Sequence, residues 1–134
     1  MRWSHAVVDQ AASVIAVDDR PAFLDVVRTV VRATPGMVMV AEANCGEQAV
    51  ELVEEMRPDL VVMDVRMPGI GGVGATRKIK AAHPSTIVAL ISTCSHEDLP
   101  AEIDGSAADA VICKRDLRPA VLTDLWQRHR PAAS

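Results

Sequence analysis

Short apolar runs alternate along the chain with segments in which apolar residues recur every three or four positions. The five runs are rich in Val and Ile, show little polar alternation, and lie at 13–17, 37–41, 60–63, 86–91 and 110–113. Runs of this kind are typical of parallel strands that are buried on both faces, and the segments between them are typical of crossover helices. The pattern therefore predicts an α/β fold with a sheet of five buried parallel strands.

Four of the intervening segments have the periodicity of amphipathic helices, and they lie at about 21–34, 44–57, 72–83 and 117–130. Pro21 stands in the first turn of the first helix, and Phe23 lies on the apolar face of that helix. Asn44 with Glu47 is typical of a capping box that begins the second helix. Between 95 and 105, Pro100 would break the interior of a helix. We therefore expect at most a short helix in that segment.

The length of the chain, 134 residues, fits a single domain. We expect this domain at 13–130, with a flexible N-terminal extension at 1–12 and a C-terminal tail at 131–134. The hydrophobic fraction of 49% and the charged fraction of 24% are those of a globular domain, and no apolar run is long enough to cross a bilayer. The first twelve residues also lack the layout of an export signal. These features predict a cytoplasmic protein without membrane insertion.

Charge and cysteine spacing argue against two further classes of protein. The formal net charge is −4, and the 14 basic residues are scattered instead of forming a stripe that could follow a phosphate backbone. Direct binding to nucleic acid is therefore not expected. Cys45, Cys94 and Cys113 lie in no metal-binding or disulfide-framework spacing, so we expect reduced thiols.

Polar side chains stand at the ends of four predicted strands, and they are Asp18 and Asp19, Asp64, Ser92 and Lys114. Because the carboxyl ends of parallel strands meet at one edge of a sheet, we expect these side chains to lie close together. Three crowded carboxylates repel one another unless a cation neutralises them, and Mg²⁺ prefers such oxygen ligands. A carboxylate beside Mg²⁺, with a hydroxyl and an ammonium group as donors, can accept a phosphoryl group.

The residues at this edge, with the segments around them, resemble the receiver domain of response regulators in two-component signalling. The resemblance covers about 14–129 and rests on VIAVDD, DLVVMDVRMPGIGG, ALIS, and the Lys after AVIC. The spacings between Asp19, Asp64, Ser92 and Lys114 agree with receivers of the helix-turn-helix-linked subfamily. The resemblance implies a doubly wound, flavodoxin-like sandwich with the parallel sheet order 2-1-3-4-5.

The resemblance also implies a role for each site residue. Asp64 corresponds to the phosphoacceptor, and Ser92 and Lys114 to the residues that bind the phosphoryl group and report its arrival. The implied Mg²⁺ ligands are Asp19, which would bind directly, Asp18, which would act through water, Asp64, and the backbone carbonyl of Arg66. The implied partners are a sensor histidine kinase or phosphotransfer protein, which would supply the phosphoryl group, and a downstream protein of unknown identity.

Two positions depart from the receiver pattern. Val111 stands where receivers usually have an aromatic switch residue, and Arg115 stands where a proline usually follows the lysine. The first departure leaves open an alternative, a pseudo-receiver that acts as a phosphorylation-independent interaction module. An enzyme is not expected, because an aspartyl phosphatase needs a second acid two positions after its nucleophile, and Arg20 and Arg66 stand there.

Overall fold

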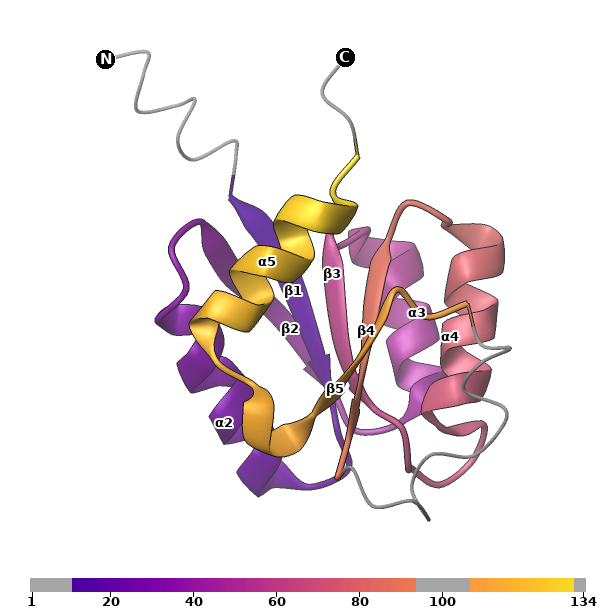
Figure 1. Cartoon of the computed structure of the whole chain (residues 1–134). Coiled ribbons are helices and arrows are strands. Elements are labelled where there is room, and N and C mark those ends of the chain that lie inside the picture. The colour runs from indigo at the N-terminus through magenta and orange to yellow at the C-terminus, as the bar shows by residue number, and fades with distance from the viewer. Residues whose placement is uncertain (1–10, 94–106, 132–134) are drawn as a thin grey trace.

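All five predicted strands form one parallel sheet in the computed structural model, which describes residues 11–93 and 107–131 (Figure 1). The strands are β1 (Ala12–Val17), β2 (Met37–Ala43), β3 (Leu60–Asp64), β4 (Ile87–Ser92) and β5 (Ala110–Cys113). Their order in the sheet is β2-β1-β3-β4-β5. The chain thus moves outward from β1 to β2 and then returns past β1 to β3, which confirms the predicted doubly wound topology.

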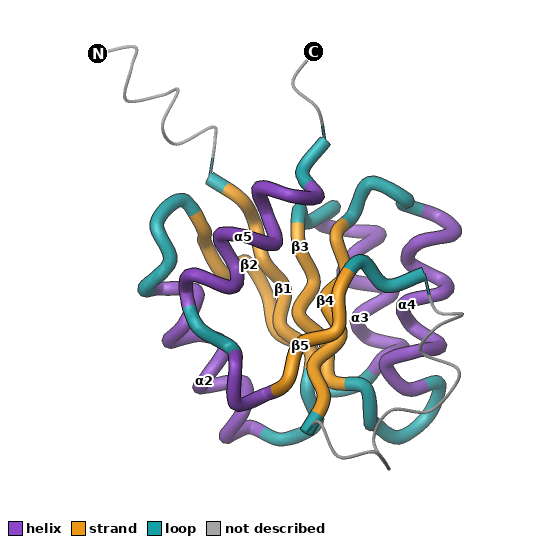
Figure 2. Tube along the Cα trace, viewed as in Figure 1, coloured by secondary structure: helices purple, strands orange, loops and turns teal. Residues whose placement is uncertain are grey.

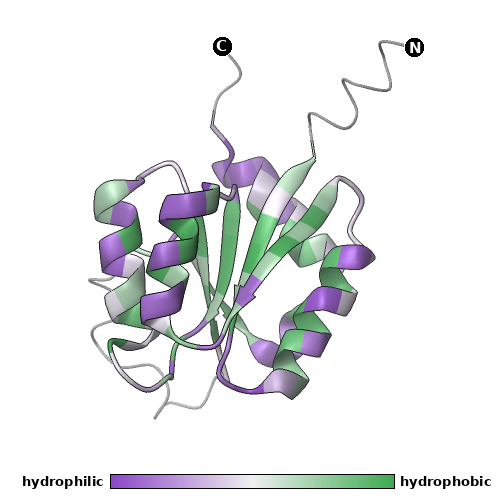
Figure 3. Cartoon of the chain, turned by 180° about the vertical axis from the view of Figure 1, so that it is seen from behind, coloured by the Kyte–Doolittle hydropathy of each residue, from purple (hydrophilic) through white to green (hydrophobic). Residues whose placement is uncertain are grey.

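Helices cover both faces of the sheet (Figure 2). They are α2 (Pro21–Arg32), α3 (Gly46–Met56), α4 (Gly71–Ala82) and α5 (Pro119–His129), with a short 3₁₀ helix, η3 (Lys114–Asp116). One apolar cluster lies between the sheet and the pair α2 and α5, and a second lies between the sheet and the pair α3 and α4. Seen from behind, apolar strands are flanked by helices whose outer sides are hydrophilic (Figure 3). None of the described helices combines the length and apolar composition that a bilayer-spanning segment needs.

The prediction that all five strands are buried is correct for the central three only. Strands β3 and β4 are buried at every position, and β1 at all but one. Strands β2 and β5 are the two edges of the sheet, and Val38 and Val111 in them are 46% and 43% exposed. An edge strand has a neighbour on one side only, so a run of apolar residues does not by itself establish burial.

The predicted capping box at the start of α3 is wrong. The helix begins at Gly46, with Cys45 as its N-cap and no capping side chain. The backbone N–H of Asn44 donates instead to the side-chain oxygen of Gln48, at 3.0 Å. A Cβ on Gly46 would lie 2.7 Å from the carbonyl oxygen of Gly71, so close packing against α4 accompanies this start.

Other boundaries differ by small amounts, and the short helix considered near Pro100 lies outside the described residues. The last helix begins at Pro119 instead of Leu117, because η3 precedes it and proline suits the first helical turn.

The prediction of reduced thiols also needs correction. Cys113 is disulfide-bonded and Cys45 is free, while Cys94 lies outside the described residues.

Candidate functional site

Four strands bring the predicted site residues to one edge of the sheet. Asp18 and Asp19 follow β1, Asp64 and Ser92 end β3 and β4, and Lys114 follows β5. The strand register aligns these ends, because Asp64 is paired with Ile91 and Ser92 with Cys113, the residue before Lys114. The structure therefore brings together all five side chains predicted to meet.

Three carboxylates form the centre of the site. Asp18, Asp19 and Asp64 each offer an oxygen atom, and these atoms lie within 4.8 Å of one another. Asp18 and Asp64 are buried, with 1% and 7% of their surfaces exposed, whereas Asp19 is exposed. Oxygen ligands at this spacing suit a hard divalent cation, which would offset their mutual repulsion.

The two oxygens of Asp18 have different surroundings. Oδ1 accepts a hydrogen bond of 2.8 Å from the backbone N–H of Arg20, so this side chain also caps the turn between β1 and α2. Oδ2 is buried and accepts no hydrogen bond within the part of the chain that the structure describes. The Nζ atom of Lys114 lies 3.3 Å from it as an ion-pair partner. A buried carboxylate oxygen with unused acceptor capacity suits a metal ligand.

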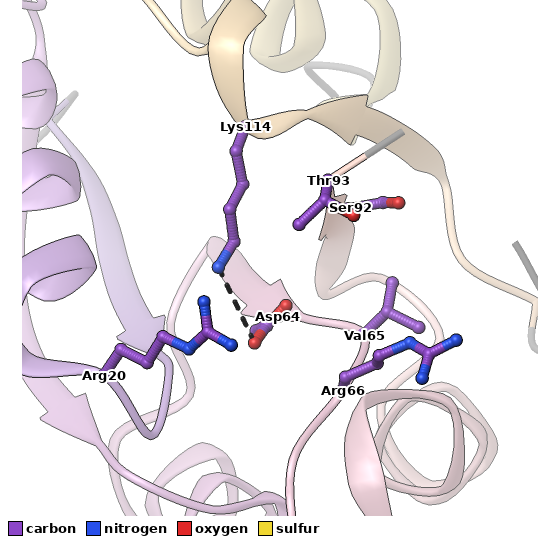
Figure 4. Close-up of a pocket in the computed structure, with 7 residues that line it drawn as sticks. All are labelled: Arg20, Asp64, Val65, Arg66, Ser92, Thr93 and Lys114. Atoms are coloured by element: carbon purple, nitrogen blue, oxygen red, sulfur yellow. Dashed lines mark ion pairs between the residues drawn. The ribbon is translucent and has the colours of Figure 1, made fainter. Parts of the chain in front are cut away.

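Lys114 crosses the site from β5 toward the carboxylates (Figure 4). Its Nζ atom lies 3.8 Å from Oδ2 of Asp64 and 4.5 Å from the centroid of the Phe23 ring. The ring belongs to α2 and holds the ammonium group by a cation–π contact. Sequence reasoning placed Phe23 only on the apolar face of a helix, because periodicity does not show which distant side chain a helix end contacts.

Asp64 has a raised pKa of about 6, compared with an ordinary value of 3.8. Burial is the main cause, and the charges of Asp18 and Asp19 raise it further. Lys114 and the backbone N–H of Arg66 act in the opposite direction but do not compensate. Burial and the neighbouring carboxylates therefore make the ionised form of Asp64 costly in the metal-free site.

A pocket opens over Asp64 (Figure 4), and its lining residues are Arg20, Asp64, Val65, Arg66, Ser92, Thr93 and Lys114. Its cationic side chains come from three different segments of the chain. Sequence reasoning considered Arg66 for its backbone carbonyl and missed the Arg20 side chain as part of the site. The position of Arg20 directly after the acidic pair was the available signal. The pocket is open to an anionic ligand that approaches Asp64.

The two departures from the receiver pattern are visible in the structure. Val111 is exposed on β5, and the described residues contain no cis peptide bond, so the bond between Lys114 and Arg115 is trans.

Backbone hydrogen bonds fix both ends of the turn that follows Asp64. The N–H of Val65 donates to the carbonyl of Ile91, and the N–H of Gly72 donates to the carbonyl of Val65, each at 3.0 Å.

Comparison with known proteins agrees with this fold and pocket. Residues 14–124 match the model of the response regulator receiver domain. The chain belongs to this family, and it is a receiver of two-component signalling rather than a catalytic enzyme. Its match to regulators of the LuxR and NarL type supports the predicted likeness to helix-turn-helix-linked receivers.

Individual relatives show how far the likeness extends. The chain is 34% identical to the response regulator GacA of Pseudomonas aeruginosa over 101 residues, which are 75% of this chain and 47% of that protein. It is 31% identical to the nitrate/nitrite regulator NarL of Escherichia coli over 124 residues, or 92% and 56% of the two chains. The chain thus spans about half the length of these curated relatives.

Solved structures give the same result. The receiver of a putative NarL from Mycobacterium tuberculosis superposes with a TM-score of 0.75 at 28% identity, over 87% of this chain and 97% of that one. A LuxR-family regulator from Aurantimonas superposes with a TM-score of 0.77 at 27% identity, over 90% and 89% of the two chains. These similarities agree with the receiver fold of the chain.

Proposed function

We propose that this chain is a cytoplasmic, phosphorylation-switched receiver that accepts a phosphoryl group on Asp64. A sensor histidine kinase or phosphotransfer protein would supply the group, and contacts with a downstream protein would pass on the signal. The observation that carries the proposal is that the carboxylates of Asp18, Asp19 and Asp64 gather within 4.8 Å of one another beneath an open pocket, with the Lys114 ammonium group 3.8 Å from Asp64. A merely structural turn would not need three carboxylates and a lysine at this spacing.

The residues present fit a Mg²⁺ site. Asp18, Asp19 and Asp64 would supply carboxylate oxygens, and Arg66 would supply its backbone carbonyl. The buried Oδ2 atom of Asp18 supports this assignment, because it accepts no hydrogen bond from the described residues and has only the Lys114 ion pair to offset its burial. When bound, Mg²⁺ neutralises the carboxylates and stabilises negative charge on the transferred phosphoryl group.

The protein side chains then have distinct roles in the transfer. A carboxylate oxygen of Asp64 attacks phosphorus, and the bond from phosphorus to the leaving group breaks with its electron pair on that group. Lys114 would bind a phosphoryl oxygen, since its ammonium group already lies near Asp64. Ser92, which is 1% exposed and lines the pocket, would bind another through its hydroxyl and so report phosphorylation to β4.

Incubation with acetyl phosphate and Mg²⁺ is expected to add one phosphoryl group, visible by intact-mass spectrometry. Asp64→Asn should abolish the addition, because an amide is a poor nucleophile and cannot form an acyl phosphate. Asp25→Asn provides a matched control, since Asp25 is an exposed carboxylate on α2. Modification of Asp64→Asn at the wild-type level would show that another residue is the acceptor.

Metal affinity is expected to depend more strongly on Asp19 than on Asp18. Asp18 already uses one oxygen to accept the Arg20 N–H and is assigned to act through water, whereas Asp19 is assigned as a direct ligand. Calorimetric titration of Mg²⁺ should give a loss of at least about tenfold for Asp19→Ala, a change of about 1.4 kcal/mol. Equal affinities in the wild type and Asp19→Ala would remove this assignment.

Self-dephosphorylation is expected to be slow. Arg66 and Cys94 stand two residues after the proposed acceptor and the hydroxyl residue, and neither orients water as a carboxylate or carboxamide would. Arg66 lines the pocket, where its bulk and charge would shield the acyl phosphate, while Cys94 lies outside the described residues. Arg66→Asn should therefore shorten the lifetime of the phosphorylated protein, as measured by phosphate release. An unchanged lifetime would contradict the shielding role.

The readout is proposed to run through Ser92 and the loop that follows it, because Val111 has no ring to move. That loop lies outside the described residues beyond Thr93. Hydrogen exchange with and without beryllofluoride, a phosphoryl mimic, distinguishes the receiver from a pseudo-receiver. Changes in the segment from Thr93 to Ala107 support a switch. Changes confined to the Asp64 loop would favour a phosphorylation-independent interaction module.

A further inference from the structure

We propose that Arg20 is a phosphoryl-binding residue, whose guanidinium group binds the phosphoryl oxygens of small anionic phosphodonors opposite Lys114. The proposal rests on the proposed phosphorylation of Asp64 and extends it to the way the donor is bound. Arg20 lines the pocket over Asp64, and its side chain points toward that carboxylate (Figure 4).

The backbone of Arg20 is fixed at the rim of the pocket. Its N–H donates to Oδ1 of Asp18 at 2.8 Å, and its carbonyl accepts from the N–H groups of Phe23 and Leu24 at 3.0 and 3.3 Å. Pro21, the next residue, restricts the chain further because its ring fixes φ. The side chain therefore extends from a fixed backbone, and this lowers the entropic cost of binding an anion.

The guanidinium group of Arg20 makes no hydrogen bond or ion pair with the described residues, although carboxylates lie nearby. Arg28 differs, because its guanidinium binds both Asp25 and Glu42. Arg20 thus keeps its donors available at the pocket. A guanidinium group offers a planar fork that binds two oxygens of a phosphoryl group at once, with short charge-assisted hydrogen bonds.

The charge of the site affects how strongly it attracts an anionic phosphodonor. The carboxylates of Asp18 and Asp19 stand beside the proposed acceptor, and Mg²⁺ together with Lys114 would only offset the charge of all three carboxylates. A neutral site gives little attraction to a phosphodonor, which is itself an anion. Arg20 and Arg66 both line the pocket and add positive charge that draws the donor in, and the guanidinium group of Arg20 orients the phosphoryl oxygens before the attack by Asp64.

The transfer balances without a further reactant. With acetyl phosphate, the new bond joins a carboxylate oxygen of Asp64 to phosphorus, and the broken bond leaves its electron pair on acetate. With phosphoramidate, the nitrogen leaves as ammonia, having taken a proton from water or from the donor itself. Both donors share the phosphoryl group and differ in the leaving group. An equal effect of Arg20 on both donors therefore indicates that it contacts the phosphoryl group.

The test compares Arg20→Ala and Arg20→Lys in the full chain, with Arg32→Ala as the control. Arg32 is an exposed arginine in the last turn of α2, so its removal changes the net charge equally. With Mg²⁺ present, Arg20→Ala should raise the half-saturating concentration of both donors and of beryllofluoride by about tenfold, the loss of one charge-assisted contact. Arg20→Lys should recover part of the loss, and Arg32→Ala should match the wild type.

Several outcomes would overturn the role of Arg20 and leave phosphorylation intact. Wild-type saturation in Arg20→Ala would do so, as would an equal loss in Arg32→Ala, which would indicate a general charge effect. A loss with acetyl phosphate alone would place the contact on the acyl group instead. A weaker Mg²⁺ affinity in Arg20→Ala would point to disruption of the metal site, because removal of a cation should not weaken it. If the wild type itself takes up neither donor nor beryllofluoride, the proposed function fails first.

Discussion

Gly72→Ala is expected to destabilise the domain by roughly 3 kcal/mol, the cost of inserting a methyl group where backbone cannot give way. Gly72 lies in the first turn of α4, and a Cβ there would stand 2.2 Å from the carbonyl oxygen of Asp64 and 2.9 Å from Cα of Val65. Both atoms belong to the backbone at the end of β3. The methyl group could be accommodated only by moving the residue that carries the proposed acceptor.

Chemical denaturation measures the loss of stability, and Gly74→Ala provides the matched control. Gly74 is the second residue after Gly72 in α4, and an added Cβ there would meet only the Ile70 side chain, at 3.1 Å. Because alanine also favours a helix over glycine, Gly74→Ala should change the free energy of unfolding by less than about 1 kcal/mol. If both variants lose a similar free energy of unfolding, the start of α4 itself requires glycine, and the contact of Gly72 with the Asp64 backbone is not the cause. Gly72→Ala should in addition slow phosphorylation of Asp64.

The sheet and its polar edge could be predicted because both depend on local sequence. The central strands are mostly apolar, and a polar residue stands at or directly after the end of each one. A polar residue at such a place is not explained by packing of the core, so it indicates a possible site. Parallel pairing then brings those ends together whatever the helices do. For this reason Asp18, Asp19, Asp64, Ser92 and Lys114 could be grouped before any contact was known.

Contacts between distant segments could not be predicted in the same way. Phe23 was expected on an apolar helix face, yet its ring also supports Lys114, because the start of α2 lies beside the end of β5. The lack of a side chain at Gly72 lets α4 approach the backbone at the end of β3, and no pattern within a single helix indicates this contact. The capping box failed for a similar reason, because packing against α4 accompanies a later start of α3. Periodicity and propensity describe one element, and these features belong to pairs of elements.

Asp64→Asn is expected to stabilise the metal-free protein at neutral pH while abolishing phosphorylation. The pKa of Asp64 is raised from 3.8 to about 6 in the folded protein, chiefly by burial and then by Asp18. The folded state therefore binds this proton more tightly than the unfolded state. Its favourable contribution is complete below the unfolded pKa and is lost as the pH rises through the folded pKa.

The magnitude follows from the shift after allowance for solvent. The full shift would correspond to about 3 kcal/mol, but the pocket opens to water and ions screen the charge, so we expect roughly 1–2 kcal/mol. Asparagine has nearly the same shape and no charge, so it removes the repulsion from Asp18 without leaving a cavity. At pH 7 the ionised wild type should be the less stable protein by this amount.

Urea denaturation in a chelating buffer between pH 4 and pH 8 measures the effect. The stability advantage of Asp64→Asn should grow as the pH rises toward about 6 and level off above it, since both states of the wild type are then ionised. Asp25→Asn, at an exposed carboxylate, should show no such growth. Added Mg²⁺ should stabilise the wild type more than Asp64→Asn and so narrow the gap, because only the wild type retains all three carboxylates. An advantage that does not vary with pH would mean that the Asp64 charge is already balanced in the folded protein, and that the carboxylate cluster does not need a cation.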